Sequence, residues 1–413
     1  MLIWVAAALV ALGLGVVYLL STATIAIPKP SGPHAVGFAS TTISDRTRTV
    51  TLDIWYPASS TEGCRAAPYN EAALRVALAK YQGIPANLNR ETPSFAFQDA
   101  PVLGGRHPVV IFNHGYGSFS KQNASTTQEL ASYGYMVLSL AHPGDSLIAQ
   151  DAQGQIAEFD GQDEVYQQLR VSQKAPAFAA GLATHLAAQR RAGTPEAHLA
   201  ATQALTRGLP YSLLGPLRQR WFYDTRLVIT RLAQTRLSQD ESDSILSAAD
   251  TSRVSVMGHS FGGVTALDIA RDPLPGVQRV IDLDGPWLEA LGGEGGSSSE
   301  LKVPVLALLS TQNIQQRQDL GLHGTFDAPL RQGRHGNHAI EIAGTAHMNF
   351  TDLNFIPILR RFSPLLGRVD NRRMARLMNR AILEFLSRGP ASAAAPLLPA
   401  EHDVRQQFFP PAD

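Results

Sequence analysis

The sequence predicts an α/β fold in which helices cover both faces of a mostly parallel sheet. Short apolar stretches such as "HPVVIFN" (107–113) and "RVSVM" (253–257) alternate with segments of helical spacing. Each apolar stretch ends in a polar or glycine-containing loop, as buried parallel strands do. The chain has 413 residues, of which 44% are hydrophobic, so it is long enough for one large domain with insertions or for two domains.

The predicted elements follow one another along the whole chain. Residues 48–59 alternate in polarity and contain a proline near their end, which indicates an edge strand. Residues 120–134 have helical spacing and end at Gly134, a typical helix C-cap. Further strands are expected in 107–113, 134–141, 253–257, 277–283, 304–309 and 338–343, and further helices in 221–237, 264–272 and 372–388.

Composition along the sequence divides the chain into four parts. Residues 1–27 form an apolar leader, and the Pro/Gly-rich "PKPSGPH" that follows it opens a catalytic domain expected over 28–390. Residues 150–222 are rich in Ala, Gln, Leu and Arg without a clear strand pattern, so they predict a helical insert that acts as a cap. Residues 391–413 are expected to form a flexible tail.

The leader predicts export or anchoring. Its uncharged run from Leu2 to Leu20 is long enough to span a membrane, whereas signal-peptide cores usually have ~7–15 residues. Small residues ending at Ala23 and Ala26 nevertheless fit cleavage sites. We expect a transmembrane anchor with the catalytic part outside the cytoplasm, with a cleaved signal peptide as the alternative. A buried core helix is the third interpretation.

Composition excludes several classes of function. The 35 basic residues equal the 35 acidic residues, so the net charge gives no reason to expect nucleic acid as a partner. Cys64 is the single cysteine, which rules out an intramolecular disulfide and a clustered-thiolate zinc site.

The motif "GHSFGG" (258–263) carries the chemistry. A G-x-S-x-G match is informative when a strand precedes it and a helix follows, as the flanking sequences predict here. Glycines at 258 and 262 let the backbone turn sharply, and the helix amino terminus favours negative charge. Ser260 is therefore the candidate nucleophile, and a tight turn without chemistry is the alternative.

A serine hydroxyl needs a base, and the base needs a carboxylate that orients it. In this architecture the chain order is Ser, Asp or Glu, then His. Asp282 and Asp284 share one strand face, but Asp284 stands at the strand end and is preferred. His347 follows a predicted strand and is preferred as the base over the other late histidines, His323, His335 and His338.

The developing oxyanion needs two hydrogen-bond donors. One is the amide of Phe261, which follows the nucleophile, and the other is expected in the loop "HGYGSF" (114–119) after a predicted strand. The Tyr116 amide is the preferred second donor. His114 and Gly115 are expected only to shape the loop.

These segments resemble the plasma-type platelet-activating factor acetylhydrolases and their bacterial relatives, which are serine esterases of the α/β-hydrolase fold. The resemblance covers about 31–388 apart from the insert. It rests on "SGPHAVG", "LDIWYP", "HGYGSF", "LASYGYMVLSLAHPGDS", "GHSFGG", "IDLDGPW" and "AHMNFTD". It implies the same roles for Ser260, Asp284, His347, Tyr116 and Phe261, and hydrolysis of short or oxidised sn-2 acyl groups of phospholipids without a metal or cofactor.

Two departures limit what the resemblance implies. The rim "AHPGDS" carries less charge than in the animal enzymes, and the insert could cap the pocket and change acyl preference. A broad carboxylesterase, lipase or cutinase-like polyester hydrolase is therefore an alternative. A catalytically silent, tethered binding module is a further alternative from another class.

Overall fold

The structure is a computed structural model that covers most of the chain. Among the residues that the structure describes, no helix combines the length and the apolar character that crossing a bilayer requires. The anchor or signal peptide predicted in 1–27 lies, apart from Gly15 and residues 25–27, outside the described residues. These are 15, 25–82, 91–151, 154–174, 176–194, 197, 200–201, 204, 214–235, 244–285, 300–319, 329–331, 333, 335–389 and 394–411.

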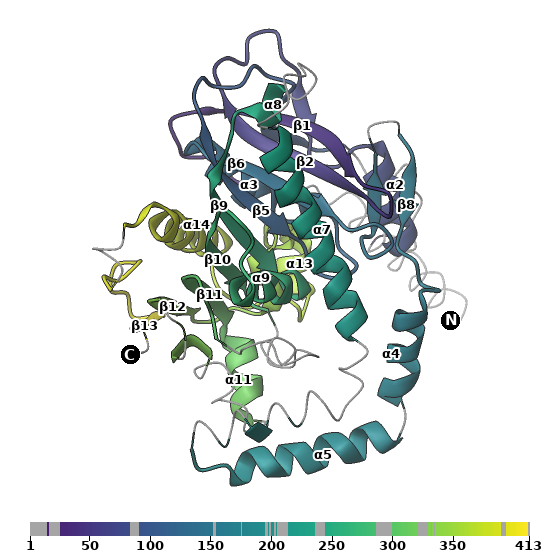
Figure 1. The fold of residues 1–413 in the computed structure, drawn as a ribbon, viewed down its shortest axis with the longest axis vertical. Helices are drawn as coiled ribbons and strands as arrows, with labels where there is room; N and C mark the ends of the chain where they lie inside the picture. Colours follow the sequence, from purple (N-terminus) through teal and green to yellow (C-terminus); the bar gives the residue numbers. More distant parts are fainter. Residues whose placement is uncertain are drawn as a thin grey trace, which may run out of the picture.

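One large sheet runs through the body of the molecule (Figure 1). In the described ranges its strands follow the order β13-β12-β11-β10-β9-β5-β6-β2-β1-β4-β3. Their bounds are β1 Ala35–Ser44, β2 Thr49–Ala58, β3 Ala66–Pro68, β4 Pro93–Gln98, β5 His107–Asn113, β6 Met136–Ala141, β9 Ala249–His259, β10 Val277–Leu283, β11 Val305–Ser310, β12 Asn337–Ile342 and β13 Val404–Phe409.

The six central strands confirm the predicted parallel sheet. Strands β12, β11, β10, β9, β5 and β6 pair in parallel, each with the next. Their carboxyl ends therefore lie along one edge, where the polar loops of an α/β sheet gather. Strands β2 and β13 add antiparallel neighbours at the two sides of this central group.

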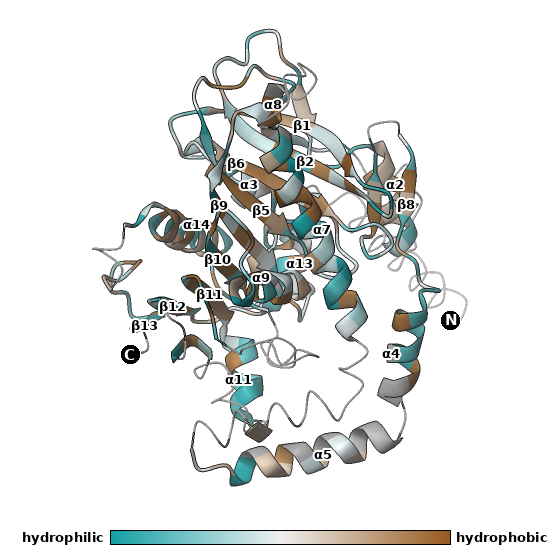
Figure 2. Ribbon diagram, in the orientation of Figure 1, coloured by the Kyte–Doolittle hydropathy of each residue, from teal (hydrophilic) through white to brown (hydrophobic). Residues whose placement is uncertain are grey.

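Helices cover both faces of the sheet, as the sequence predicts. On one face, α7 (Leu214–Thr235) and α9 (Phe261–Arg271) bury residues such as Val228 and Leu267 against the strands. On the other, α3 (Ala124–Ser132) and α14 (Asn371–Ser387) contribute residues such as Leu130 and Ile382. The strands between them are largely brown in Figure 2 because both faces are buried and apolar.

The described part of the insert is mainly helical, as expected. A short antiparallel hairpin leads into the insert and is formed by β7 (Ile148–Gln150) with β8 (Ile156–Glu158). The sequence pattern does not predict this hairpin. Helix α5 lies well away from the sheet in Figure 1. The remaining helices are α2 Ala72–Gln82, α4 Glu164–Lys174, α5 Pro176–Arg191, α8 Ser244–Ser247, α11 Thr311–Asp319 and α13 Pro357–Phe362, with 3₁₀ turns η2 Ser120–Asn123, η5 His347–Phe350 and η6 Asp352–Phe355.

Two expectations about sheet edges are wrong. Strand β2 is not at an edge, because β1 pairs with it antiparallel on the side away from β6. The carboxyl-terminal segment is not a loose tail, because β13 pairs with β12 and buries Phe409 to 1% exposure. The Gln406 amide exchanges two hydrogen bonds with the backbone of Leu398, which fixes the segment before the strand. The strand sequence VRQQFF does not alternate between apolar and polar residues, so the pattern gives little sign of this docking.

Candidate active site

Ser260 stands at a sharp turn between β9 and α9. Its φ of 55° lies in the left-handed region, which costs a non-glycine residue on the order of 1–3 kcal/mol. Glycines allow the turn to form. A Cβ on Gly258 would meet the Gly262 carbonyl oxygen at 2.0 Å, and one on Gly262 would meet the Asn113 carbonyl oxygen at 2.1 Å. The sequence motif is therefore a strained elbow that holds Ser260 at the carboxyl edge of the sheet.

Asp284 follows β10 at the same edge and is fully buried. Its φ is also 55°, so the chain turns there as it leaves the strand. The carboxylate accepts hydrogen bonds from the Ser310 amide at 2.7 Å and the Ser310 hydroxyl at 2.9 Å. The Asn313 side-chain amide donates a further bond at 3.2 Å. These neutral donors hold the carboxylate in one orientation without neutralising its charge.

His347 is the partner of this carboxylate. Its Nδ1 lies 2.8 Å from Asp284 Oδ2, and its side chain is 39% exposed. The imidazole is held at the beginning of η5, and Nε2 is the nitrogen left for exchange with a substrate or a nucleophile. Of the alternative histidines, His338 lies buried on β12, while His323 falls outside the described residues.

Asp282, the alternative carboxylate, has a different position. It is buried at the end of β10 and accepts a hydrogen bond from the Gly285 amide at 2.9 Å. A Cβ on Gly263 would lie 2.0 Å from its Oδ1, so Asp282 packs against the first turn of α9. The structure brings Asp284 to His347, and Asp282 to the backbone around the elbow.

Ser260, Asp284 and His347 line one surface pocket of about 250 Å³. Its other wall is polar and comes from the end of β11 and the first turns of α11. The residues on that wall are Ser310, Gln312, Asn313 and Gln316.

The predicted oxyanion loop lies beside the elbow. A Cβ on Gly115 would be 3.4 Å from the Ser260 Cβ, so the loop backbone passes close to the nucleophile. The rings of Tyr116 and Phe261 stand edge to face with centroids 6.0 Å apart. The two residues predicted as amide donors are thus brought together next to Ser260.

Aromatic side chains of the insert pack on this loop. Phe159 and Tyr166 have ring centroids 5.5 and 6.4 Å from that of Tyr116. Trp221 of α7 lies edge to face with Phe261, with centroids 5.1 Å apart. The described part of the insert therefore supports the Tyr116 side of the site, and none of its residues is among those that line the pocket.

A second histidine–aspartate pair lies inside the protein, under the oxyanion loop. His142 Nδ1 is 2.9 Å from Asp224 Oδ2, and both side chains are fully buried. The His142 ring stacks on Trp221 with centroids 3.7 Å apart. Arg48 also forms an ion pair with Asp224. Burial by itself raises the pKa of Asp224, but the hydrogen bonds from His142 and Arg48 outweigh it and leave the pKa below its usual range.

The sequence reasoning missed Ser310 and Asn313, which hold Asp284. Ser310 ends a strand neighbouring the one that leads to Asp284, so a polar residue at the carboxyl end of a buried strand is the signal that could have found it. Asn313 gives no such signal, because it reaches Asp284 from α11 only once the helix is in place.

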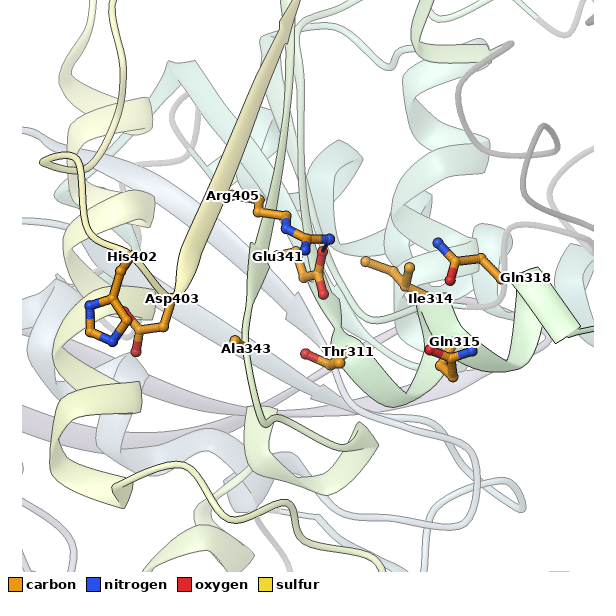
Figure 3. Close-up of a pocket in the computed structure, with 9 residues that line it drawn as sticks. All are labelled: Thr311, Ile314, Gln315, Gln318, Glu341, Ala343, His402, Asp403 and Arg405. Carbon is orange, nitrogen blue, oxygen red and sulfur yellow. Dashed lines mark hydrogen bonds and ion pairs between the residues drawn. The ribbon is translucent and has the colours of Figure 1, made fainter.

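A second pocket, of about 320 Å³, lies on the other side of α11 (Figure 3). In Figure 3, the side chains of Arg405 and Glu341, which both line this pocket, point toward each other. The Thr311 hydroxyl donates to the Ile342 carbonyl and accepts from the Gly344 amide, at 3.1 Å each. The Thr311 hydroxyl therefore donates to a backbone carbonyl and not to a basic side chain. Within the described ranges, no group of three His, Cys, Asp or Glu side chains is arranged to hold a metal ion.

Comparisons with known proteins identify the family and the fold. The sequence model of the family "Platelet-activating factor acetylhydrolase, isoform II" matches residues 19–179 and 238–392. Platelet-activating factor acetylhydrolases of Cavia porcellus and Gallus gallus are each 24% identical, over 88% of this chain and 77% and 83% of theirs. A ferulic acid esterase from Streptomyces cinnamoneus superposes with a TM-score of 0.65 at 20% identity, over 92% of this chain and 98% of its own. The predicted resemblance and fold are confirmed.

Proposed function

Because the chain belongs to the isoform II family of platelet-activating factor acetylhydrolases, we propose that its Ser260 site releases short or oxidised sn-2 acyl groups from phospholipids. Family membership makes the protein a serine ester hydrolase of the α/β-hydrolase fold. The observation that carries the site assignment is the 2.8 Å contact of His347 Nδ1 with buried Asp284, beside a serine on a strained elbow.

The proposed reaction has two steps. In the first, Ser260 Oγ forms a bond to the ester carbonyl carbon while its proton passes to His347 Nε2. The carbon–oxygen ester bond then breaks, and His347 gives the proton to the departing alcohol or lysophospholipid. In the second step, water attacks the acyl-enzyme by the same route and releases the acid. Asp284 orients His347 and stabilises the positive charge that it gains.

The amides of Tyr116 and Phe261 hold the oxyanion in this proposal. Their support is the close approach of the Gly115 backbone to Ser260 and the packing of the two rings. Removing one such donor typically lowers kcat by ~10²–10³. Phe261 also stands at the first position of α9, where the helix dipole favours negative charge.

The pocket supports a small acyl group. Its volume of about 250 Å³ lies below the ~300–1,000 Å³ typical of sites for drug-sized ligands. A second candidate, a broad carboxylesterase of lipase or cutinase type, is favoured by the 39% exposure of His347, since an accessible base can meet esters of bulky alcohols.

Hydrolysis of glycerophosphocholines with sn-2 chains from acetyl to palmitoyl, by wild type and Ser260→Ala, tests the proposal. We expect release that depends on Ser260 and is limited to short chains. Release that depends on Ser260 without chain or head-group preference would instead establish the broad esterase. No release from these lipids or from an activated acetate ester would support the silent binding module.

The proposal includes an extracytoplasmic location. It rests on the uncharged run from Leu2 to Leu20, which acts as an anchor or as a signal peptide. An anchor would also raise the local concentration of the enzyme at lipid surfaces. Fractionation of expressing cells, with amino-terminal sequencing of the mature chain, separates the two forms. Recovery of the uncleaved chain in the cytosol would contradict both.

A further inference from the structure

His259, the residue before the nucleophile, is buried beneath the predicted base. It is 2% exposed, and its ring lies 4.6 Å from that of His347, centroid to centroid. His259 Nε2 lies 3.2 Å from the His347 carbonyl oxygen, and Nδ1 lies 2.8 Å from Nε2 of Gln122. The proposed mechanism gives His259 no role, although it contacts the main chain of the histidine that moves the proton.

The direction of these hydrogen bonds follows from chemistry. The Gly115 amide can only donate, so the Gln122 atom 2.9 Å from it is the side-chain oxygen. The Gln122 nitrogen therefore faces His259 Nδ1, which must accept. The proton of the neutral ring is then on Nε2 and is donated to the His347 carbonyl. Burial keeps the pKa of His259 well below its usual range, and nearby His347 adds to the effect.

Asn123 extends the same network to the other end of η5. Its side-chain nitrogen donates to the Phe350 carbonyl at 2.6 Å, so its oxygen is the atom that accepts from Gln122 at 3.0 Å. Gln122 is 4% exposed and Asn123 fully buried. Under this assignment each of the hydrogen bonds named has one donor and one acceptor, so one arrangement of protons satisfies all of them.

We propose that Gln122 and His259 form a relay of hydrogen bonds that ties the oxyanion loop to the main chain of His347 and sets the distance between that histidine and Ser260. Both are positioning residues. The relay joins Gly115, which precedes the predicted oxyanion donor Tyr116, to the segment that carries the base. This inference rests on the proposed function of the Ser260 site, since the relay would act by setting the rate of proton transfer between Ser260 and His347.

The variant Gln122→Glu tests the relay by removing both hydrogen bonds that Gln122 donates. A carboxylate still accepts from the Gly115 amide, but it can no longer donate to His259 or to the side-chain oxygen of Asn123. His259 must then carry a proton on Nδ1. At high pH, where the ring is neutral, this proton comes from Nε2 and leaves a lone pair facing the His347 carbonyl, whereas at lower pH the ring beside the carboxylate can hold a second proton and keep that bond. We expect kcat at high pH to fall about 10- to 100-fold with KM within twofold of wild type, because substrate binding does not involve this network.

Gln128→Glu is the matched control. Gln128 is a buried glutamine of α3 that accepts from the Phe95 amide and donates to the Ala124 carbonyl, both at 2.8 Å. The Gln128→Glu variant also introduces a buried carboxylate, but at a position whose hydrogen-bond partners are Phe95 and Ala124 and not Gln122 or His259. We expect an equal loss of stability and an unchanged kcat. An equal fall of kcat in both variants would overturn the relay.

The tautomer gives a readout that does not depend on activity. Two-bond ¹H–¹⁵N spectra of protein labelled on its histidines should show His259 as a neutral ring with the proton on Nε2. The signal is assigned by its loss in His259→Gln. In Gln122→Glu the proton should appear on Nδ1. An Nδ1 proton in wild type would overturn the relay, whereas hydrolysis that persists in Ser260→Ala would overturn only the proposed function.

Two substitutions of His259 test the relay if the Gln122→Glu variant does not fold. A glutamine side chain can bring an amide nitrogen to the position of Nε2, and an asparagine can only occupy the position of Nδ1. We therefore expect His259→Asn to lose most of kcat and His259→Gln to recover it. Equal kcat in the two variants would overturn the proposal.

Discussion

The molecule contains two histidine–aspartate pairs with nearly the same bond and different environments. The Nδ1–carboxylate distance is 2.8 Å for His347 with Asp284 and 2.9 Å for His142 with Asp224. His347 is 39% exposed and lines the pocket of Ser260, whereas His142 is fully buried and stacked on Trp221.

The carboxylates also differ in their other partners. Asp284 receives neutral donors from Ser310 and Asn313, while Asp224 forms an ion pair with Arg48. A carboxylate already paired with a cation has less charge to offer an imidazolium. In the proposed function, therefore, a histidine–aspartate pair acts as a base only where the histidine has access to a nucleophile and the carboxylate has no cationic side chain as a further partner. The following experiments test that distinction.

Asp284→Asn should have the largest effect. The variant keeps the shape of the side chain but no longer holds His347 in the tautomer that accepts a proton at Nε2, so we expect kcat to fall about 10⁴-fold. Chemical denaturation should show a small change in the free energy of unfolding. Asp282→Asn is the control, and a larger loss of kcat there would transfer the role to Asp282.

Asp224→Asn should act on stability. Removing one member of a buried ion pair leaves the Arg48 charge uncompensated, so we expect a loss of roughly 3–5 kcal/mol in the free energy of unfolding. Activity per folded molecule should stay within threefold of wild type, measured at a temperature where the variant is folded. A 100-fold fall in kcat without destabilisation would contradict the structural role of this pair.

Asp352 is a buried carboxylate that, unlike Asp284 and Asp224, is not paired with a histidine in the hydrogen bonds described. It accepts hydrogen bonds from Ser125 and contacts Tyr69. Burial raises its pKa to about 7, against hydrogen bonds that lower it. The folded state thus keeps a proton that the unfolded chain loses near pH 4. We expect stability to decline between pH 4 and 7, by on the order of 4 kcal/mol, and then to level off.

Thermal unfolding of wild type and Asp352→Asn across this pH range measures the effect. The variant has no proton to lose at this position, so the decline assigned to Asp352 should disappear. The same decline in both proteins would mean that another group titrates.

Ser310→Ala should have the smallest effect. It removes the hydroxyl donor of Asp284 but keeps the Ser310 backbone amide bond, so we expect kcat to fall about 10-fold. Ser310→Thr can restore the hydroxyl and should recover most of the rate. A rate unchanged by Ser310→Ala would show that the amide bond alone suffices.

The sequence determined the parts of the protein that depend on local pattern and chain order. Apolar runs predicted the central strands, and the spacing around Ser260 predicted the elbow, since only a strand–turn–helix with glycines permits that backbone. Strand-end positions led to Asp284 and His347, because carboxyl ends of parallel strands meet at one edge.

Only the tertiary structure decided which distant groups support them. The bond from Gln122 to His259 joins residues 137 positions apart, and Asn123 reaches Phe350 over 227. Strand β13 docks through pairing with β12, although its sequence VRQQFF lacks the alternation that predicts a strand. Such contacts depend on side-chain packing between elements, which periodicity and chain order do not encode.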